Sequence, residues 1–253
     1  LVSAHRGGPV PGLPENALET FDYSLNHAPA LIETDVRVTA DGQLVLLHDE
    51  TLDRTTTGTG RLDAMTLPEV RQLRLVADDT TVTPFRIPTL DEALAWADAR
   101  AVLLLDVKRG VGLDALVAAI RQRGAEDRVA VITYSLDAHR QLAALAPDLM
   151  VSATAETTEQ ADALLASGLD MSRVIAWAGI GPPDPAVVGR LQAVGIRVQA
   201  GAFGAIDQTA LATASPDPYD AILATGADVI SSDAVPLAAL AARAETLSRR
   251  SER

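Results

Sequence analysis

Apolar runs of strand length alternate with amphipathic helical segments along almost the whole chain, and this alternation strongly constrains the fold. Nine runs have strand character: residues 1–5, 31–36, 44–48, 102–107, 129–133, 149–153, 173–177, 196–200 and 228–232. Helical periodicity fills most of the intervals, as in LDALVAAIRQRG and PAVVGRLQAVG. Strands that are apolar on both faces and separated by helices indicate a parallel sheet with helices outside. A length of 253 residues suits one (β/α)8 barrel.

One pair of neighbouring runs has no helix between its members. Only the seven residues RVTADGQ separate 31–36 from 44–48, which is too short for a parallel crossover. Because Asp41-Gly42 is a strong signal for a two-residue hairpin loop, we expect 44–48 to fold back antiparallel on 31–36. The remaining eight strands then form a TIM barrel with a hairpin extension after its second strand. No linker, repeat or low-complexity segment interrupts the chain, so residues 1–253 are predicted to form a single domain.

The predicted hairpin would also bring titratable side chains together. With a two-residue loop, Ala40 pairs with Gln43, and Asp35 comes to lie opposite His48. Directly opposed residues have Cβ atoms about 4.5–5.5 Å apart. Glu33 is two residues before Asp35 and therefore shares its face of the strand. This register predicts two carboxylates beside a histidine, whereas a bulge would shift the pairing by one residue.

Acidic side chains recur inside strands that should be buried. Glu33 and Asp35 share one face of IETDV, and like charges there are costly unless a cation or a proton joins them. Asp106 ends a run of leucines, and Lys108 follows on the same face. Three carboxylates from two strand ends suit one divalent cation with oxygen ligands, Mg²⁺ or Ca²⁺. Since His5 also ends a strand, all five residues occupy the end of the barrel where active sites lie.

Other residues in the sequence leave more than one interpretation open. The pair His5-Arg6 in HRGG is either a strand end with a flexible turn or a proton carrier beside an anion clamp. His27 is expected at a surface helix end and His139 on the solvent face of a helix. Trp177 ends a strand, where it either stacks on a ligand or packs in the core.

Composition excludes several classes of function. Without cysteine, the chain can form neither disulfides nor thiolate metal sites, and it has no cysteine nucleophile. A net charge of −13 argues against nucleic acid as a partner and disfavours an anionic membrane surface. No apolar run approaches the roughly 20 residues of a membrane span, so no stable membrane insertion is expected. The chain opens on a strand at Leu1 and Val2, so we expect an upstream segment to have been removed, which favours a secreted or periplasmic protein.

Six segments resemble the glycerophosphodiester phosphodiesterases, a family of (β/α)8-barrel enzymes. They are AHRGG, PENALETF, IETDVRVTADGQLVLLHDETLDRTTTGTG, IPTLDEAL, LLLDVK and GADVISSD. These segments extend over residues 4–233, and the long third segment is highly specific. Relatives with the wording GLPENALETF are often exported, in agreement with a trimmed N-terminus. The resemblance implies that His5 and His48 are catalytic, one as general base and the other as general acid, and that Arg6 and Lys108 contact the phosphate.

The same resemblance implies a metal site and its supporting residues. Glu33 and Asp35 match two ligands of a divalent cation. Asp106 stands where the family more commonly has Glu, so its shorter side chain either lengthens that contact or admits a water. Glu15 and Asn16 of the PEN turn match positions that support the site on the substrate-binding side.

The implied reaction is the metal-dependent hydrolysis of a small glycerophosphodiester to glycerol 3-phosphate and an alcohol. VQAGAFG replaces the family's usual late Trp-Thr-Val-Asn strand, which leaves substrate selectivity open. One alternative is a lysophospholipase D or a sphingomyelinase D-like enzyme, although no long apolar lid is evident. A second alternative is a non-catalytic phospho-ligand-binding barrel, which would keep Arg6 and Lys108 but would need neither histidine nor metal. No feature of the sequence predicts an oligomeric state.

Overall fold

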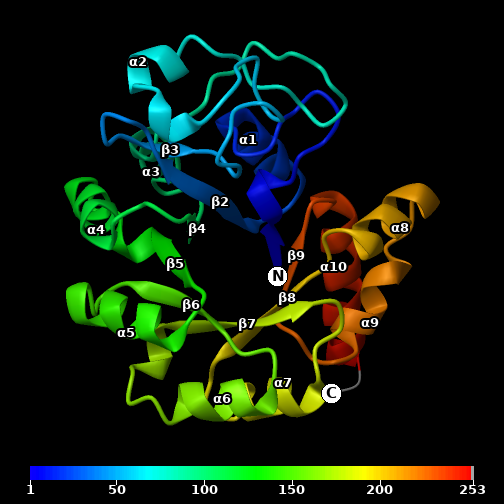
Figure 1. Ribbon diagram of the computed structural model, residues 1–253. Helices are drawn as coiled ribbons and strands as arrows, with labels where there is room; N and C mark the ends of the chain where they lie inside the picture. Colours follow the sequence, from blue (N-terminus) through cyan, green and yellow to red (C-terminus); the bar gives the residue numbers. More distant parts are fainter. Residues whose placement is uncertain (252–253) are drawn as a thin grey trace.

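Within residues 1–251, the part of the chain that the computed structural model describes, eight parallel strands close into a barrel (Figure 1). Strand β1 pairs with both β2 and β9, which closes the ring. The barrel strands are β1 Val2–Ala4, β2 Ala30–Val38, β4 Leu103–Val107, β5 Val129–Thr133, β6 Met150–Thr154, β7 Val174–Ile180, β8 Arg197–Gly201 and β9 Val229–Ser232. The predicted barrel is confirmed, with strand bounds within a few residues of those expected. The predicted domain boundary at Arg253 lies outside the described residues.

Helices surround the strands on the outside of the ring (Figure 1). They are α1 Leu18–His27, α2 Leu67–Val70, α3 Leu90–Trp96, α4 Leu113–Gln122, α5 Leu136–Leu145, α6 Thr158–Leu165, α7 Pro185–Gln192, α8 Ala205–Thr213, α9 Asp220–Leu223 and α10 Val235–Ser251. Short 3₁₀ turns are η1 His5–Gly7, η2 Leu62–Ala64, η3 Glu126–Arg128, η4 Met171–Arg173 and η5 Asp217–Tyr219. Among the described residues, no helix is both long and apolar enough to cross a bilayer.

The strands divide their side chains between two environments. Outward-facing residues such as Ile32, Leu103 and Leu105 are fully buried and belong to the large core between the strands and the helices. Inside the barrel, Leu104 and Ala130 form a small apolar layer together with neighbouring aliphatic residues. Because this layer closes the barrel interior, the polar inward-facing residues beyond it are concentrated at the carboxyl ends of the strands.

The hairpin after β2 forms as predicted, but its register differs by one residue. Strand β3, Leu44–Leu46, runs antiparallel to β2 and places Val36 opposite Leu46. Thr39 and Gln43 close a three-residue loop, in which Gly42 has a φ of 79°. A left-handed glycine at the end of such a loop gives a three-residue turn in place of a two-residue one.

This register overturns the predicted pairing of Asp35 with His48. The amide of Leu47 donates to the carbonyl oxygen of Asp35 at 3.1 Å, so Leu47 takes the position expected for His48. His48 instead lies beyond the end of β3, in the segment that leads away from the barrel. The prediction failed because the sequence signal Asp41-Gly42 does not distinguish a two-residue from a three-residue loop.

Residues 47–89 form a cover over one side of the barrel mouth, drawn mainly in cyan in Figure 1. This segment supplies most of an apolar cluster that is separate from the main core and includes Leu47, Leu52, Leu75 and Ile87. Ala17 and Val45 complete the cluster from outside the segment. Helix α2 begins with a capping box of Thr66 and Glu69. The cover thereby fixes the positions of polar residues that follow β3.

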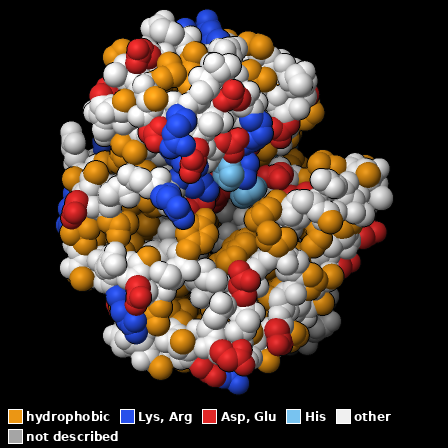
Figure 2. Space-filling model, viewed as in Figure 1, with side chains coloured by type: hydrophobic (Ala, Val, Ile, Leu, Met, Phe, Trp, Pro, Cys, Tyr) orange, Lys and Arg blue, Asp and Glu red, His pale blue; other side chains and the backbone are white. Residues whose placement is uncertain are grey.

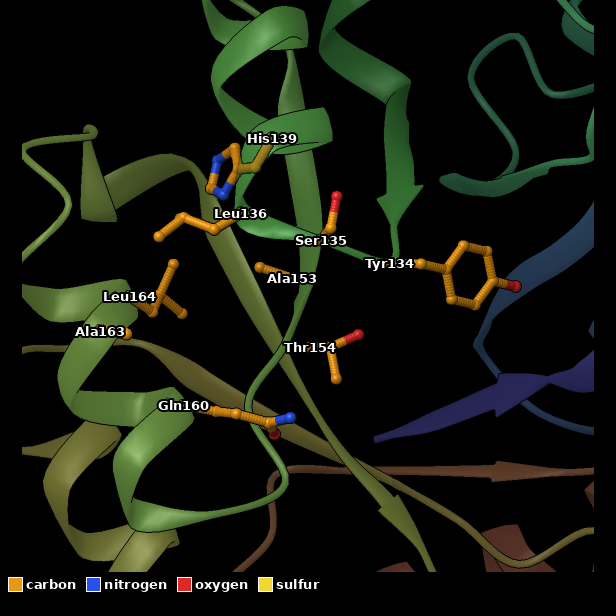
Figure 3. Close-up of a pocket in the computed structure, with 9 residues that line it drawn as sticks. All are labelled: Tyr134, Ser135, Leu136, His139, Ala153, Thr154, Gln160, Ala163 and Leu164. Carbon is orange, nitrogen blue, oxygen red and sulfur yellow. The ribbon is translucent and has the colours of Figure 1, made fainter.

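The prediction that His139 faces solvent is wrong. His139 is only 3% exposed, and its Nδ1 has no hydrogen-bond partner within the described residues. It points into a cavity of about 140 Å³ between α5 and α6, which Leu136 and Leu164 also line (Figure 3). Burial lowers the pKa of His139. The helical pattern identified α5, but it did not indicate that α6 packs against this face.

Candidate active site

The HRGG segment forms a tight turn directly after β1. Arg6 has a left-handed backbone, with a φ of 49°, and its amide donates to Oε2 of Glu33 at 2.6 Å. Gly7 has a φ of 87°, and a Cβ at this position would lie 2.3 Å from the ring of Phe21. A Cβ on Gly8 would lie 2.7 Å from Val235. The two glycines therefore allow the turn to pack against α1 and α10. This packing fixes the backbone positions of His5 and Arg6.

Three carboxylates meet inside the barrel mouth. Glu33 and Asp35 lie on the inner face of β2, and Asp106 is the register partner of Asp35 on β4. Each residue offers an oxygen, and these oxygens lie within 4.8 Å of one another. All three side chains are buried. The predicted convergence of these carboxylates is thus present in the structure.

The two carboxylates of β2 have pKa values shifted in opposite directions. Burial, reinforced by the charge of Asp35, raises the pKa of Glu33 to about 8. Burial would also raise the pKa of Asp35, but the Lys108 ammonium and the Asn16 amide outweigh it and lower that pKa. Nζ of Lys108 lies 2.8 Å from Oδ1 of Asp35 and also pairs with Asp106. One ammonium therefore compensates only part of the negative charge of this cluster.

The cluster fits a hard divalent cation. Oδ1 of Asp106 is buried and has no hydrogen-bond partner among the described residues. Its other oxygen is engaged, because the Tyr134 hydroxyl donates to Oδ2 at 2.7 Å. Oxygens that ligate one Ca²⁺ at about 2.3–2.6 Å lie no more than about 5 Å apart. Glu33, Asp35 and Asp106 thus present the ligand type and the spacing that such an ion requires.

His5 lies next to this cluster and is held from two sides. Its Nδ1 donates to Oδ1 of Asp233 at 2.8 Å, and its ring stacks on Phe203 with centroids 3.9 Å apart. Burial would lower the pKa of His5, but the hydrogen bond to Asp233 and the nearby charge of Glu33 raise it. Asp233 is fixed in turn, because its amide donates to Asp207 at 2.6 Å.

His48 approaches the cluster from the cover segment. Its Nδ1 donates to Oδ1 of Asp49 at 2.7 Å, and its charge contributes to lowering the pKa of Asp35. Arg54 binds Asp49 through Nε at 2.6 Å and binds both oxygens of Glu15. The ring of His48 is therefore fixed by a chain of ion pairs that reaches the PEN turn.

The PEN turn connects the two sides of the site. Glu15 accepts from Arg6 at 3.0 Å as well as from Arg54. Asn16 is buried, donates to Asp35 at 2.8 Å and accepts from the Thr34 hydroxyl and the Asp35 amide. The side chains of Glu15 and Asn16 thus orient charged groups of the site.

A pocket of about 200 Å³ continues from the carboxylates into the barrel. Trp177 lines it and stacks on Phe203 at 6.0 Å, as an aromatic wall opposite the charged groups. Oε1 of Gln199 lies at this pocket, buried and without a hydrogen-bond partner in the described structure. Figure 2 shows a central hollow with histidine, lysine and arginine side chains on one side and hydrophobic side chains on the other.

The structure adds site residues that the sequence did not identify. They are Asp49, Arg54, Tyr134, Phe203 and Asp233. Three of them lie in segments that carry the family resemblance, where no chemistry had been assigned to them. Tyr134 directly follows a predicted strand, so its location at the barrel mouth could have been inferred from the barrel rule. Phe203 lies in VQAGAFG, and no sequence signal indicated that it stacks on His5.

The fold and this arrangement define a (β/α)8-barrel protein with an acidic cation site, two oriented imidazoles and two cationic side chains at one mouth. The chain belongs to the Glycerophosphoryl diester phosphodiesterase family, whose sequence model matches residues 5–200. It is 34% identical over 158 residues to a glycerophosphodiester phosphodiesterase of Caldanaerobacter subterraneus, a match that covers 60% of this chain and 65% of that relative. It is 32% identical over 174 residues to Bacillus subtilis YqiK, covering 66% and 71% of the two chains.

Solved structures agree with this assignment. A glycerophosphoryl diester phosphodiesterase from Parabacteroides distasonis superposes with a TM-score of 0.89 at 32% identity, covering 96% of this chain and 86% of that one. A phosphodiesterase of Oleispira antarctica, solved in complex with the product sn-glycerol-3-phosphate, has the same fold, with a TM-score of 0.76 at 23% identity. That match covers 96% of each chain. The matched region spans just under two thirds of the Caldanaerobacter relative's length.

Proposed function

We propose that this chain hydrolyses glycerophosphodiesters to glycerol 3-phosphate and an alcohol. The observation that carries the proposal is the convergence of three buried carboxylates with His5 and His48, each imidazole held by its own aspartate. A barrel that only bound a phosphate would need neither oriented imidazole. Membership of the family supports the same reaction.

Charge explains what the cationic residues do. Attack on a phosphodiester builds negative charge on the oxygens around phosphorus, so preorganised positive groups lower the barrier. Arg6 and Lys108 supply fixed positive charge, and both are held in place by carboxylates of the site. One divalent cation, Mg²⁺ or Ca²⁺, bound by Glu33, Asp35 and Asp106 would add positive charge and polarise an attacking hydroxyl.

The inner pocket is proposed to hold the glycerol of the substrate. Its polar floor includes Gln199, whose buried Oε1 needs a hydrogen-bond donor, and Ser231 lies beside it. A glycerol hydroxyl would satisfy that oxygen, and Trp177 would cover the carbon chain. This orientation places the glycerol inside the barrel and directs the leaving alcohol towards the open mouth.

The orientation assigns a role to each histidine. His5 lines the inner pocket, so it is placed to take the proton from the attacking hydroxyl. If that hydroxyl belongs to a water, glycerol 3-phosphate forms directly; if it is the glycerol 2-OH, a cyclic phosphodiester forms and a water must then open it. His48 lies on the cover segment at the mouth and is placed to protonate the leaving alcohol. The aspartates accept from Nδ1 of each ring, which leaves Nε2 for proton transfer.

The test is release of glycerol 3-phosphate from glycerophosphocholine, with and without a chelator. His5→Ala and His48→Ala should each lower the rate by about 10²–10⁴-fold, as expected for loss of an acid–base group. His27→Ala is the matched control, because this exposed ring bonds only the Tyr23 carbonyl in the described structure and should leave the rate unchanged. Binding without turnover in the metal-replete protein would contradict the proposal. Cleavage of lysophosphatidylcholine in its place would favour the lipid phosphodiesterase alternative.

A further inference from the structure

A second cavity, of about 200 Å³, lies at the rim of the barrel mouth outside the inner pocket. Its charged lining residues are Arg37, Arg61, Arg109, Glu50 and Asp63. Arg61 is neutralised, because it bonds Asp63 through two nitrogens and Glu50 through a third. Both carboxylates of this cavity are therefore already bonded to Arg61. Arg37 and Arg109 remain, and they make the cavity positively charged.

Arg37 and Arg109 form no ion pair within the described part of the chain. The only hydrogen bond of the Arg37 side chain there runs from Nε to the carbonyl oxygen of His48, at 2.8 Å, which leaves its terminal nitrogens available. Arg109 is exposed and has no side-chain hydrogen bond among the described residues. Most other arginines of this acidic chain bond a carboxylate, so two neighbouring guanidiniums without one are unusual for it.

The position of these arginines relates them to the reacting centre. Arg37 follows Asp35 by two residues on the same strand, so it lies about 7 Å further towards the rim on the same face. Arg109 directly follows Lys108 at the start of the β4–α4 loop. The backbone of His48 is bonded to Arg37, so the cavity is next to the histidine that we assign to the leaving alcohol.

We propose that Arg37 and Arg109 form a subsite for an anionic group carried by the leaving alcohol of the substrate. The preferred substrates are then glycerophosphodiesters whose head group carries a second phosphate or a carboxylate a few bonds beyond the scissile phosphorus. Guanidinium groups suit such anions because they offer several donors in a planar fork. This proposal rests on the proposed function and adds a substrate class to it.

The experiment compares two substrates that differ only in the second anion. Glycerophosphoglycerol has an uncharged leaving glycerol, whereas bis(glycerophospho)glycerol presents the same glycerol with a further phosphodiester. The wild-type protein should show a higher initial kcat/KM for the second substrate, after correction for its two equivalent ends. Arg109→Ala should lower the ratio of the two kcat/KM values by about 2- to 5-fold, the range of an exposed, partly screened ionic contact. Arg109→Glu should lower it further.

Two further variants test whether the change in the kcat/KM ratio comes from the subsite. Arg37→Gln keeps a donor for the His48 carbonyl and should lower the same ratio. Arg197→Ala removes another exposed charge from the opposite end of the barrel, at the start of β8, and should not change the ratio. The ratio should also fall as salt rises, because the Debye length is only about 8 Å at physiological ionic strength.

The outcomes distinguish the two levels of the proposal. If neither substrate releases glycerol 3-phosphate, the proposed function itself fails. If both are cleaved with equal kcat/KM, or if Arg109→Ala leaves the ratio unchanged, only the subsite is refuted. If the wild type shows no preference but inorganic phosphate alters glycerophosphoglycerol cleavage in the wild type and not in Arg109→Ala, the arginines bind a free anion and the proposal is overturned.

Discussion

Arg54 binds both carboxylate oxygens of Glu15, at 2.9 and 2.8 Å, and so joins two loops that carry opposite sides of the candidate active site. The same guanidinium bonds Asp49, which orients His48, while Glu15 also bonds Arg6. His48, the proposed acid–base group, and Arg6, the proposed phosphate-binding cation, thus share one brace. The positions of His48 and Arg6 therefore both depend on Arg54, although neither residue contacts Arg54 directly.

Arg54→Ala should therefore reduce kcat more than it changes KM. Without the brace, Asp49 loses its main partner and the ring of His48 is no longer held in one orientation. We expect a loss of about 10- to 100-fold in kcat, within the contribution of a positioned acid–base group. Arg54→Lys cannot bridge both carboxylates and should recover only a small part of the rate. A variant that folds normally and keeps full kcat would show that this brace has no role in positioning.

Asp233→Asn should move the pH profile in a defined direction. Burial lowers the pKa of His5, and the hydrogen bond to Asp233 is the largest contribution that raises it. An uncharged partner should therefore lower this pKa, so His5 loses its proton at a lower pH than in the wild type. A ¹³C or ¹⁵N NMR titration of the imidazole measures the shift independently of turnover. A pKa of His5 that stays constant or rises in the variant would contradict the geometry.

Glu33 predicts how the stability of the metal-free protein depends on pH. Its pKa is raised to about 8 in the folded protein from an ordinary value of 4.5. Between these values the folded state binds more protons than the unfolded state, so stability should fall as pH rises from about 4.5 to about 8. Melting temperatures measured in excess chelator test this slope, and Glu33→Gln should flatten it. Saturating Ca²⁺ or Mg²⁺ should raise the melting temperature most at the alkaline end, because the cation binds the deprotonated cluster.

Two glycine substitutions should act in opposite directions on stability. Gly7→Ala places a Cβ 2.3 Å from the buried ring of Phe21 at a φ of 87°, so it should destabilise the fold by about 2 kcal/mol or more. Gly189→Ala lies inside α7 with no atom within 4 Å of the new Cβ, and it should stabilise by about 0.5–1 kcal/mol. Urea unfolding of the two variants measures both signs. If the two substitutions changed the free energy of unfolding equally, the HRGG turn would tolerate a side chain.

The sequence was sufficient for the barrel because its signals are periodic and local. Each predicted strand lies within a few residues of an observed strand, and the pattern TLDE forms the capping box of Thr89 and Glu92 that begins α3. Glu33, Asp35 and Asp106 were also identifiable, since carboxylates inside apolar strands require a compensating charge. Their convergence follows from the common direction of parallel strands.

What could not be predicted depends on packing between distant segments. The hairpin register depends on whether Gly42 completes a two-residue or a three-residue loop. The two loops differ in length by one residue, and no sequence signal distinguishes them. The burial of His139 depends on α6, and the pairing of His5 with Asp233 joins opposite ends of the chain. Stacking of Phe203 on His5 is likewise a product of the closed ring.

The separate apolar cluster under residues 47–89 gives the barrel mouth a modular construction. The carboxylates lie on strands of the ring and His5 directly follows one, whereas His48 lies in a segment that packs mainly on this second cluster. Substitutions in that segment would alter the proposed exit path of the alcohol and leave the strands of the ring unchanged. Among barrels built in this way, changes in the cover segment would therefore alter the proposed head-group side of the centre and leave the proposed glycerol pocket as it is.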